Sequence, residues 1–163
     1  MQNFDAIWKI YSDSFPKEER RTLEQQINIL NKNRYNLNPI YHEDMLVGFY
    51  AVWDLDTFLF IEHIAIDRKF RAKGCGSKAI KNIIHKFDKI ILEVEKPETY
   101  EAKRRIEFYK RLGFHLNNYD YEQPAYDDNK ESVPLLIMSY PNKINENEFE
   151  NVKNKLYKMV YKV

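Results

Sequence analysis

A short basic turn with two glycines lies near the middle of the chain, and its residue order suits the binding of phosphate groups. An apolar run, Phe58 to Ile66, leads into the pattern Arg71-x-x-Gly74-x-Gly76. Apolar residues at helical spacing follow, so the turn joins a predicted strand to a predicted helix. Glycines let the backbone approach an anion, and a helix N-terminus supplies N–H donors and partial positive charge. The turn therefore predicts a binding site for a phosphorylated cofactor.

Two common phosphate-binding motifs do not fit this turn. The Walker pattern is absent, because no glycine stands at the required distance upstream of Gly76. The dinucleotide pattern GxGxxG fails because Ala79 occupies the position of its third glycine. What remains is the pattern [Q/R]-x-x-G-x-[G/A] after a strand.

That pattern resembles the acetyl-CoA motif of the GNAT family of N-acetyltransferases. A second segment, Ile106-Glu-Phe-Tyr-Lys-Arg-Leu-Gly-Phe114, resembles the family's later FYxxxGF corner between a helix and a strand. The two motifs occur in the family's order and at a fitting separation. The resemblance covers roughly residues 1–141.

The resemblance implies an α/β fold with a mixed, mostly antiparallel sheet flanked by helices on both faces. Two parallel strands, ending near Ile66 and Glu95, would splay apart and hold acetyl-CoA in the gap. The pantetheine arm would pair with main-chain groups of the strand before the turn, and the pyrophosphate would meet the turn itself. The cofactor-binding residues implied are Ile64, Ala65, Ile66, Arg71, Ala72, Lys73, Gly74, Cys75, Gly76, Ser77 and Tyr109.

Transfer of an acyl group from a thioester to an amine needs a base for the amine and an acid for the departing thiolate. The resemblance makes Tyr109 the candidate acid, because it is the tyrosine of the FYxxxGF match. A phenol, with an ordinary pKa of about 10, can donate a proton to a thiolate. The alternative is that Tyr109 only packs at the end of its helix.

The candidate bases are three carboxylates, with Glu62 ranked first and Glu95 and Glu93 after it. Regular strand alternation places Glu62 on the same face as Ile64, towards the gap. A β-bulge would reverse that parity. Glu93 and Glu95 share one face of the opposing strand. Alternation places His63 on the other face from Glu62, where we expect a core histidine.

The chain departs from the family in one place. Many members carry an asparagine upstream of the tyrosine that contacts the pantetheine arm, whereas Tyr100 to Arg105 contains none. We expect Arg104 or Arg105 to supply a substitute contact. Cys75 lies at a helix N-terminus, which favours a reactive thiol, but the motif uses only the N–H of this position.

The elements that must position these residues follow from apolar periodicity and turn residues. Helices are predicted around residues 6–15, from Pro16 to about Leu30, from the glycine turn to Lys86, and over residues 98–112 with Gly113 as cap. Strands are predicted at residues 39–41, 46–53, 58–66, 89–95, 114–116 and 135–140, with a tyrosine-rich loop over 117–133. These elements form a predicted acetyltransferase domain, residues 1–141. Residues 142–163 are predicted to be a helical extension packed on it, with a dimer contact as the alternative.

Composition narrows the functional class. The 163 residues suit one domain, and 44% hydrophobic residues suffice for a core. A net charge of +1 gives no general attraction to nucleic acid or membranes. A single cysteine, with neither a signal peptide nor a spanning segment visible, predicts a cytoplasmic protein, monomeric or homodimeric. No histidine has metal-ligand spacing with acids or cysteines, so no metal site is inferred.

The function predicted is acetyl transfer from acetyl-CoA to a primary amine of a small molecule or peptide, by direct attack in a ternary complex. A catalytically silent acyl-CoA-binding or regulatory module on the same fold is the alternative. A third, an RNA-associated protein, would need a basic face extending beyond residues 68–81. Aromatic and acidic residues that could recognise a cationic acceptor, or only pack a lid, are Tyr11, Phe15, Trp53, Tyr119, Tyr121, Tyr126, Asp120, Asp127 and Asp128.

Overall fold

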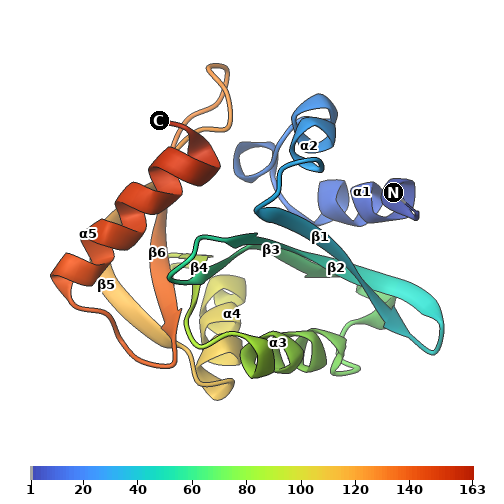
Figure 1. Cartoon of the computed structure of the whole chain (residues 1–163). Coiled ribbons are helices and arrows are strands. Elements are labelled where there is room, and N and C mark those ends of the chain that lie inside the picture. Colours follow the sequence, from blue (N-terminus) through green and yellow to red (C-terminus); the bar gives the residue numbers. More distant parts are fainter. Residues whose placement is uncertain (1) are drawn as a thin grey trace.

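The computed structural model describes residues 2–163 and contains one six-stranded sheet in the order β1-β2-β3-β4-β6-β5 (Figure 1). The strands are β1 (Tyr35–His42), β2 (Met45–Asp54), β3 (Leu59–Ile66), β4 (Ile90–Glu95), β5 (His115–Gln123) and β6 (Val133–Tyr140). The helices are α1 (Phe4–Ser14), α2 (Leu23–Ile29), α3 (Cys75–Lys86), α4 (Tyr100–Arg111) and α5 (Glu146–Lys155).

Helices cover both faces of the sheet, as predicted. Figure 1 shows α1 and α2 on one side and α3 and α4 on the other. On the α1 side, Ile7 and Tyr11 share an apolar core with Phe60 of β3 and with residues of α5. On the other side, Ile80 of α3 and Ile106 of α4 pack against the opposite face of the same strands. None of the helices within residues 2–163 has both the length and the apolar character needed to cross a membrane.

The sheet is antiparallel except at its centre, where β3 and β4 run parallel. Their pairing joins Leu59–Ile61 with Ile90–Leu92. Beyond Ile61 the two strands do not pair with each other anywhere in the described chain, although both continue. The predicted central splay is therefore confirmed, and it begins at Glu62 and Glu93.

The second predicted helix begins later than expected. Residues Lys17–Glu19 form only one 3₁₀ turn, η1, and α2 starts at Leu23. Thr22 caps α2 through a capping box with Gln25, in which each side chain bonds the backbone of the other. The prediction from Pro16 was wrong because it relied on the proline and the acids and overlooked this Thr-x-x-Gln signal.

The first part of the predicted tyrosine-rich loop, residues 117–123, is a strand. β5 extends to Gln123, so only residues 124–132 connect it to β6. A register irregularity lies between Asn117 and Tyr121, and several of the inward-facing residues of β5 are polar. The buried Asn117 side chain donates to Ser139 Oγ at 2.9 Å. Polar residues in the core hide the alternation that normally reveals a strand.

The C-terminal residues form α5, which continues into a wider π-helical turn, η3 (Leu156–Tyr161). Asn145 caps α5 by accepting from the Glu148 backbone at 2.9 Å. Phe149 and Leu156 are buried in the core that also contains residues of α1. The division of the chain at residue 141 stays a prediction.

Candidate active site

The glycine turn presents its backbone at the start of α3. Gly74 adopts a left-handed conformation (φ 77°) immediately before Cys75, the first residue of α3. Ala72 is also left-handed, at φ 63°. Arg71 Nε donates to the Ile66 carbonyl at 3.1 Å, which ties the turn to the end of β3. Because residues 71–74 are exposed, their N–H groups and the positive end of α3 are open to an anion.

Three elements meet beside this turn. A side-chain carbon built on Gly76 would lie 3.6 Å from Ile66 Cγ1 of β3 and 3.8 Å from Phe108 Cζ of α4. The glycine turn, the end of β3 and the C-terminal part of α4 therefore converge at one end of the splay.

Beyond Ile61, the main chain of β3 has no strand partner among residues 2–163 on the side that faces the gap. Ile64, Ala65 and Ile66 pair with β2 on one side only, because β4 has diverged. β2 approaches closely here: a side-chain carbon on Gly48 would lie 2.3 Å from the Ala65 carbonyl oxygen. Gly48 is thus needed for this pairing, and it was not predicted from the sequence because it belongs to no motif.

A β-bulge changes which way the β3 side chains point. β3 pairs with β2 at Ile61 and at His63 but skips Glu62. Glu62 and His63 consequently both reach groups of the α1 side, whereas Ile64 packs on the opposite face. The prediction that Glu62 shares the face of Ile64, and lies opposite His63, was wrong because an inserted residue reverses strand parity.

Glu62 is held in a buried ion pair. Arg21 Nη1 lies 2.7 Å from Glu62 Oε1, and both side chains are almost fully buried. The Trp53 indole and the Tyr126 hydroxyl donate to the carboxylate, each at 3.0 Å. Burial acts to raise the pKa of Glu62, but the charge of Arg21, the neighbouring His63 and the hydrogen bond from Trp53 outweigh it and keep the pKa below its usual range. Glu62 is therefore a fixed anion with low proton affinity.

Glu93 has a different environment. Its carboxylate accepts hydrogen bonds from Tyr121, from the Tyr161 hydroxyl at 2.6 Å and from Gln123 Nε2 at 3.3 Å. Burial raises the pKa of Glu93 to about 7 even though these donors act to lower it. Glu93 is half-buried on β4. A carboxylate with this proton affinity suits a general base near neutral pH.

Glu95 lies further along the same strand, near the mouth of the gap. Arg105 Nη1 of α4 is 3.6 Å from Glu95 Oε1, and the Glu95 side chain is 40% exposed. Burial, followed by the charge of Glu95, raises the pKa of Glu19 on η1. Glu95 therefore contributes negative charge at the entrance, where Arg105 partly balances it.

Tyr109 lies on the other face of the sheet. It packs between Phe108 and Phe114, with ring centroids 5.2 and 5.6 Å away, in the core that also contains Val94 of β4. Burial raises the pKa of Tyr109 to about 12. The hydroxyl has no hydrogen-bond partner among residues 2–163. It is thus a protonated phenol on the opposite side of β4 from Glu93.

The sequence matches the profile of the "Acetyltransferase (GNAT) family" over residues 2–114. The chain belongs to the GNAT family. A solved GNAT-family chain from Bacteroides thetaiotaomicron, assigned as an acetyltransferase, is 34% identical with a TM-score of 0.93; the match covers 99% of this chain and 93% of that one. A Bacillus subtilis (strain 168) protein with an acetyltransferase assignment, YjbC, is 25% identical over 92% of this chain and 78% of its own length.

A GNAT acetyltransferase from Elizabethkingia anophelis has been solved with acetyl-CoA bound. It shares the fold of this chain, with a TM-score of 0.53, 17% identity, and coverage of 72% of this chain and 82% of that one. A GNAT relative that shares this fold thus binds acetyl-CoA.

His63 of the GNAT protein is a core residue, as predicted, although it shares a face with Glu62. Its Nε2 lies 2.8 Å from the Glu19 carbonyl oxygen, and its ring packs edge-on against Tyr11 and Phe15. Burial lowers the pKa of His63, so the imidazole is neutral near pH 7. Its Nδ1 is 3.8 Å from Glu62 Oε2, beyond hydrogen-bonding distance.

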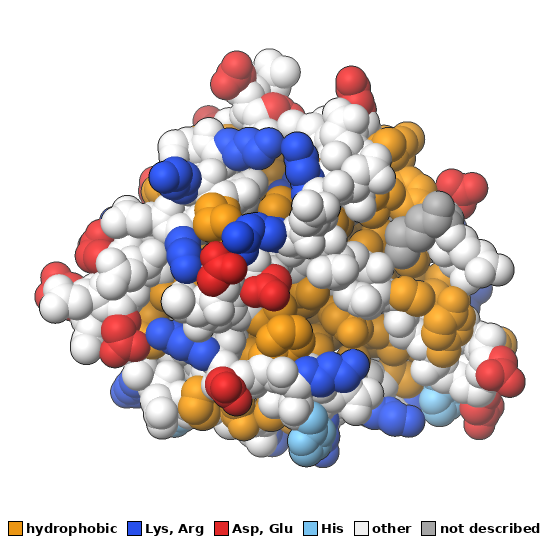
Figure 2. All heavy atoms as spheres, in the orientation of Figure 1, with side chains coloured by type: hydrophobic (Ala, Val, Ile, Leu, Met, Phe, Trp, Pro, Cys, Tyr) orange, Lys and Arg blue, Asp and Glu red, His pale blue; other side chains and the backbone are white. Residues whose placement is uncertain are grey.

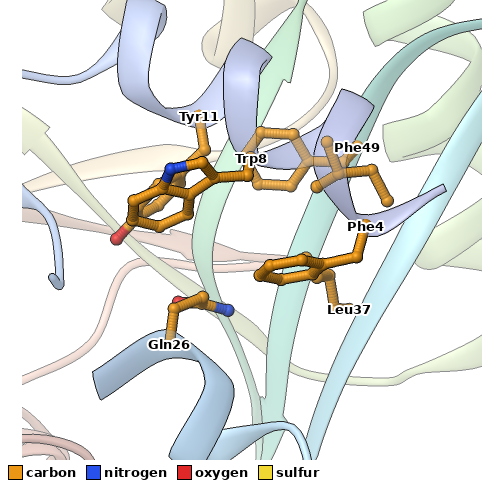
Figure 3. Close-up of a pocket in the computed structure, with 7 residues that line it drawn as sticks. Phe4, Trp8, Tyr11, Gln26, Leu37 and Phe49 are labelled. Carbon is orange, nitrogen blue, oxygen red and sulfur yellow. The ribbon is translucent and has the colours of Figure 1, made fainter. Parts of the chain in front are cut away.

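A small apolar pocket lies between α1, α2 and β2 (Figure 3). Its volume of about 10 Å³ has room for roughly one water molecule. The Tyr11 hydroxyl at its edge accepts from the Arg21 backbone N–H at 2.7 Å, which links the pocket to the Glu62 ion pair. A cavity of this size cannot hold an amine substrate. The residues lining it are Phe4, Ile7, Trp8, Tyr11, Gln26, Leu37 and Phe49.

The predicted acceptor-side aromatics divide into two groups. Trp53, Tyr121 and Tyr126 reach the carboxylates Glu62 and Glu93. The others support the fold. Tyr11 and Phe15 pack on His63, Tyr119 stacks on Phe149, and Asp127 pairs with Lys130 at 3.6 Å.

Three residues of the site, Arg21, Gln123 and Tyr161, were not predicted from the sequence. Arg21 stands in an ordinary charged run, Glu-Glu-Arg-Arg, and only the tertiary structure buries it. Gln123 was placed in a loop. Tyr161 was placed in a tail helix without a role, although a buried tyrosine usually needs a partner for its hydroxyl.

Proposed function

We propose that this GNAT protein transfers the acetyl group of acetyl-CoA to a primary amine of a small molecule or peptide, by direct attack in a ternary complex. The observation that carries the proposal is the splay between β3 and β4. It is flanked by Glu93 on one face and Tyr109 on the other, and the glycine turn lies at one end. The proposed base, the proposed acid and the proposed phosphate site would then surround one gap.

The cofactor contacts proposed are those of the family motif. The main chain of residues 64–66 would pair with the pantetheine arm, because no strand among the described residues pairs with it on the β4 side. Arg71 Nε, which donates to the Ile66 carbonyl, would have to give up that contact. The N–H groups of residues 72–77 would meet the pyrophosphate, with Arg71 and Lys73 alongside. Arg105 is already directed towards Glu95, so Arg104 is the better candidate for the contact that asparagine makes in other members.

Glu93 is the proposed general base. It would accept the proton of the amine as the amine nitrogen bonds to the acetyl carbon and the carbon–sulfur bond breaks. Tyr109 would give its proton to the departing thiolate. Glu62 is a weaker candidate because the Arg21 ion pair lowers its proton affinity. Glu95 lies further from the origin of the splay, so we place Glu93 ahead of both.

The test is CoA release by the purified protein with a panel of primary amines, followed by the variant Glu93→Gln. We expect kcat/KM of the variant to fall by about 10²–10⁴-fold, the usual contribution of a positioned acid or base. Glu122→Gln, an exposed residue of β5, is the matched control and should keep full activity. A fully active Glu93→Gln variant would exclude Glu93 as the base.

One observation favours the silent acyl-CoA-binding module. The loop over residues 124–132 crosses the acceptor side, because Tyr126 bonds Glu62 and Lys130 Nζ donates to the Arg20 carbonyl at 2.6 Å. If this loop stays closed, no amine reaches Glu93. Tight CoA binding, measured by calorimetry, without turnover of any amine in the panel would support the module and contradict the enzyme.

We also propose a cytoplasmic protein that acts as a monomer or homodimer without nucleic acid. The single cysteine, Cys75, is buried, which suits a reducing compartment. On the face shown in Figure 2, Lys and Arg side chains are interspersed with Asp and Glu around exposed hydrophobic groups. That face carries no continuous basic surface of the kind RNA binding needs.

A further inference from the structure

The C-terminal helix changes its geometry at Leu156. α5 is regular as far as Lys155, and the turn from Leu156 to Tyr161 is π-helical. A π turn links residues five apart, so Tyr161 follows Leu156 on the inward side. Val160 and Tyr161 are both buried although they are neighbours in sequence. The wider turn therefore directs one additional side chain, Tyr161, into the molecule.

The Tyr161 hydroxyl both donates and accepts a hydrogen bond beside Glu93. It donates to Glu93 Oε1 at 2.6 Å and accepts from Gln123 Nε2 at 3.1 Å. Because the oxygen of the hydroxyl accepts from Gln123, its proton is left to point at Glu93. The Tyr161 ring packs against Tyr126, with centroids 5.4 Å apart. A residue of the C-terminal π turn thus contacts the proposed base.

We propose that Tyr161 is a positioning residue for acetyl transfer, which fixes the orientation of the Glu93 carboxylate and stabilises its ionised form. The C-terminal helix would then be part of the acceptor site as well as part of the core. This inference rests on the proposed function, because Glu93 matters for catalysis only if it is the base.

The groups around Glu93 determine how loss of the Tyr161 hydroxyl should change the pKa of Glu93. Donors from β5 and η3 favour the carboxylate, whereas burial and the negative charge of Glu62 across the gap favour the protonated acid. Removing the Tyr161 hydroxyl deletes one donor, so the pKa of Glu93 should rise above its present value of about 7. The charged and titratable groups facing this site are Tyr121, Tyr126, Tyr157, Tyr161, Glu62 and, through Glu62, Arg21.

The first measurement needs no turnover. The Glu93 carboxyl carbon is titrated by NMR in the free protein and assigned by its loss in Glu93→Gln. In Tyr161→Phe we expect its midpoint to move up by about one pH unit, the effect of losing one hydrogen bond to a charged group. Tyr157→Phe is the matched control: Tyr157 lies on the same turn, but its hydroxyl donates to the Glu122 carbonyl. An unchanged midpoint in Tyr161→Phe would overturn the proposal.

The second measurement is the pH profile of kcat/KM. In Tyr161→Phe the acidic limb of the profile should move to higher pH by the same amount. At pH values below that limb kcat/KM should therefore fall roughly tenfold, and it should recover near pH 9. A loss of packing would lower the rate equally at every pH and would contradict the proposal. If Glu93→Gln is inactive but the Tyr161→Phe limb does not move, only the role of Tyr161 fails. A fully active Glu93→Gln would instead show that the proposed base itself is wrong.

Discussion

Glu62 and Glu93 occupy equivalent places on two parallel strands, yet their environments differ in kind. Each follows the last paired residue of its strand, Ile61 on β3 and Leu92 on β4. Glu62 faces a guanidinium, and its pKa is lowered; Glu93 faces tyrosines and a glutamine, and its pKa is raised to about 7. The strand position brings both carboxylates to the gap, and the partner of each determines its proton affinity.

This difference separates two uses of a buried carboxylate. The charge of Glu62, paired with Arg21, organises its surroundings: Trp53 and Tyr126 both donate to it, and the Arg21 backbone bonds Tyr11. A carboxylate that neutral donors surround can still gain and lose a proton. The paired anion Glu62 therefore suits a structural role, and Glu93 suits proton transfer.

The largest expected effect concerns the group opposite Glu93. Tyr109→Phe keeps the ring packing against Phe108 and Phe114 and removes only the proton donor. Turnover in the CoA-release assay should fall by about 10²–10⁴-fold. The melting temperature should hardly change, because the hydroxyl has no protein partner among the described residues. Full activity would reduce Tyr109 to a packing residue and leave the thiolate without an acid.

Breaking the Glu62 ion pair should cost stability. Arg21→Met leaves a buried, uncompensated carboxylate, so the free energy of unfolding should fall by about 3–5 kcal/mol in urea titrations. The double variant Arg21→Met/Glu62→Gln should recover much of that loss. Tyr121→Phe, which removes one donor from Glu93, should cost only about 1 kcal/mol, because Glu93 can take up a proton. Equal losses at the two sites would mean that the two carboxylates do not differ in this way.

The two carboxylates should also have opposite effects on stability as pH changes. The pKa of Glu93 is higher in the folded chain, about 7, than its ordinary value of 4.5. Its contribution is therefore complete below pH 4.5 and is lost as the pH rises through 7, by up to about 3 kcal/mol. The pKa of Glu62 is lowered, so its contribution is present above its ordinary pKa and is lost in acid.

Unfolding free energies of the wild type and Glu93→Gln between pH 5 and pH 8 measure this contribution. The wild type should lose stability relative to Glu93→Gln over that interval. The difference between the two curves should change most steeply between the unfolded and folded pKa values of Glu93 and level off above the folded one. Parallel curves would mean that the carboxyl titrates in the folded protein as it does in the unfolded chain.

The features that local patterns carry could be predicted from the sequence. The glycine turn, the FYxxxGF corner and the apolar run into Ile66 carried the resemblance to the GNAT family, which implied the mixed sheet and its central splay. Features that depend on tertiary contact were not predictable. The bulge at Glu62 reverses a parity that alternation alone assigns, and no local signal shows that Arg21 is buried. Tyr161 required the π turn, whose extra residue per turn leaves no clear periodicity in the sequence.

The last prediction concerns a carboxylate introduced by mutation at the glycine turn. Gly74 has φ 77°, and a side-chain carbon added to it would have no atom of the described residues within 4 Å apart from its chain neighbours, so a substitution there meets backbone strain but no clash. Asparagine tolerates this conformation, and aspartate has nearly the same shape. Gly74→Asn and Gly74→Asp should therefore fold alike and differ chiefly in one negative charge at the N-terminus of α3.

If the turn binds the pyrophosphate, calorimetry should show that Gly74→Asp binds CoA about 10–100-fold more weakly than Gly74→Asn, an electrostatic cost of roughly 1.4–2.7 kcal/mol. The difference should shrink as salt is added, because the turn is exposed and its charges are screened. Glu62 and Glu93 lie away from the turn, so the proton affinity of Glu93 should be the same in both variants. Equal CoA affinities of the Asn and Asp variants would place the phosphates elsewhere, since a carboxylate against a pyrophosphate must repel it.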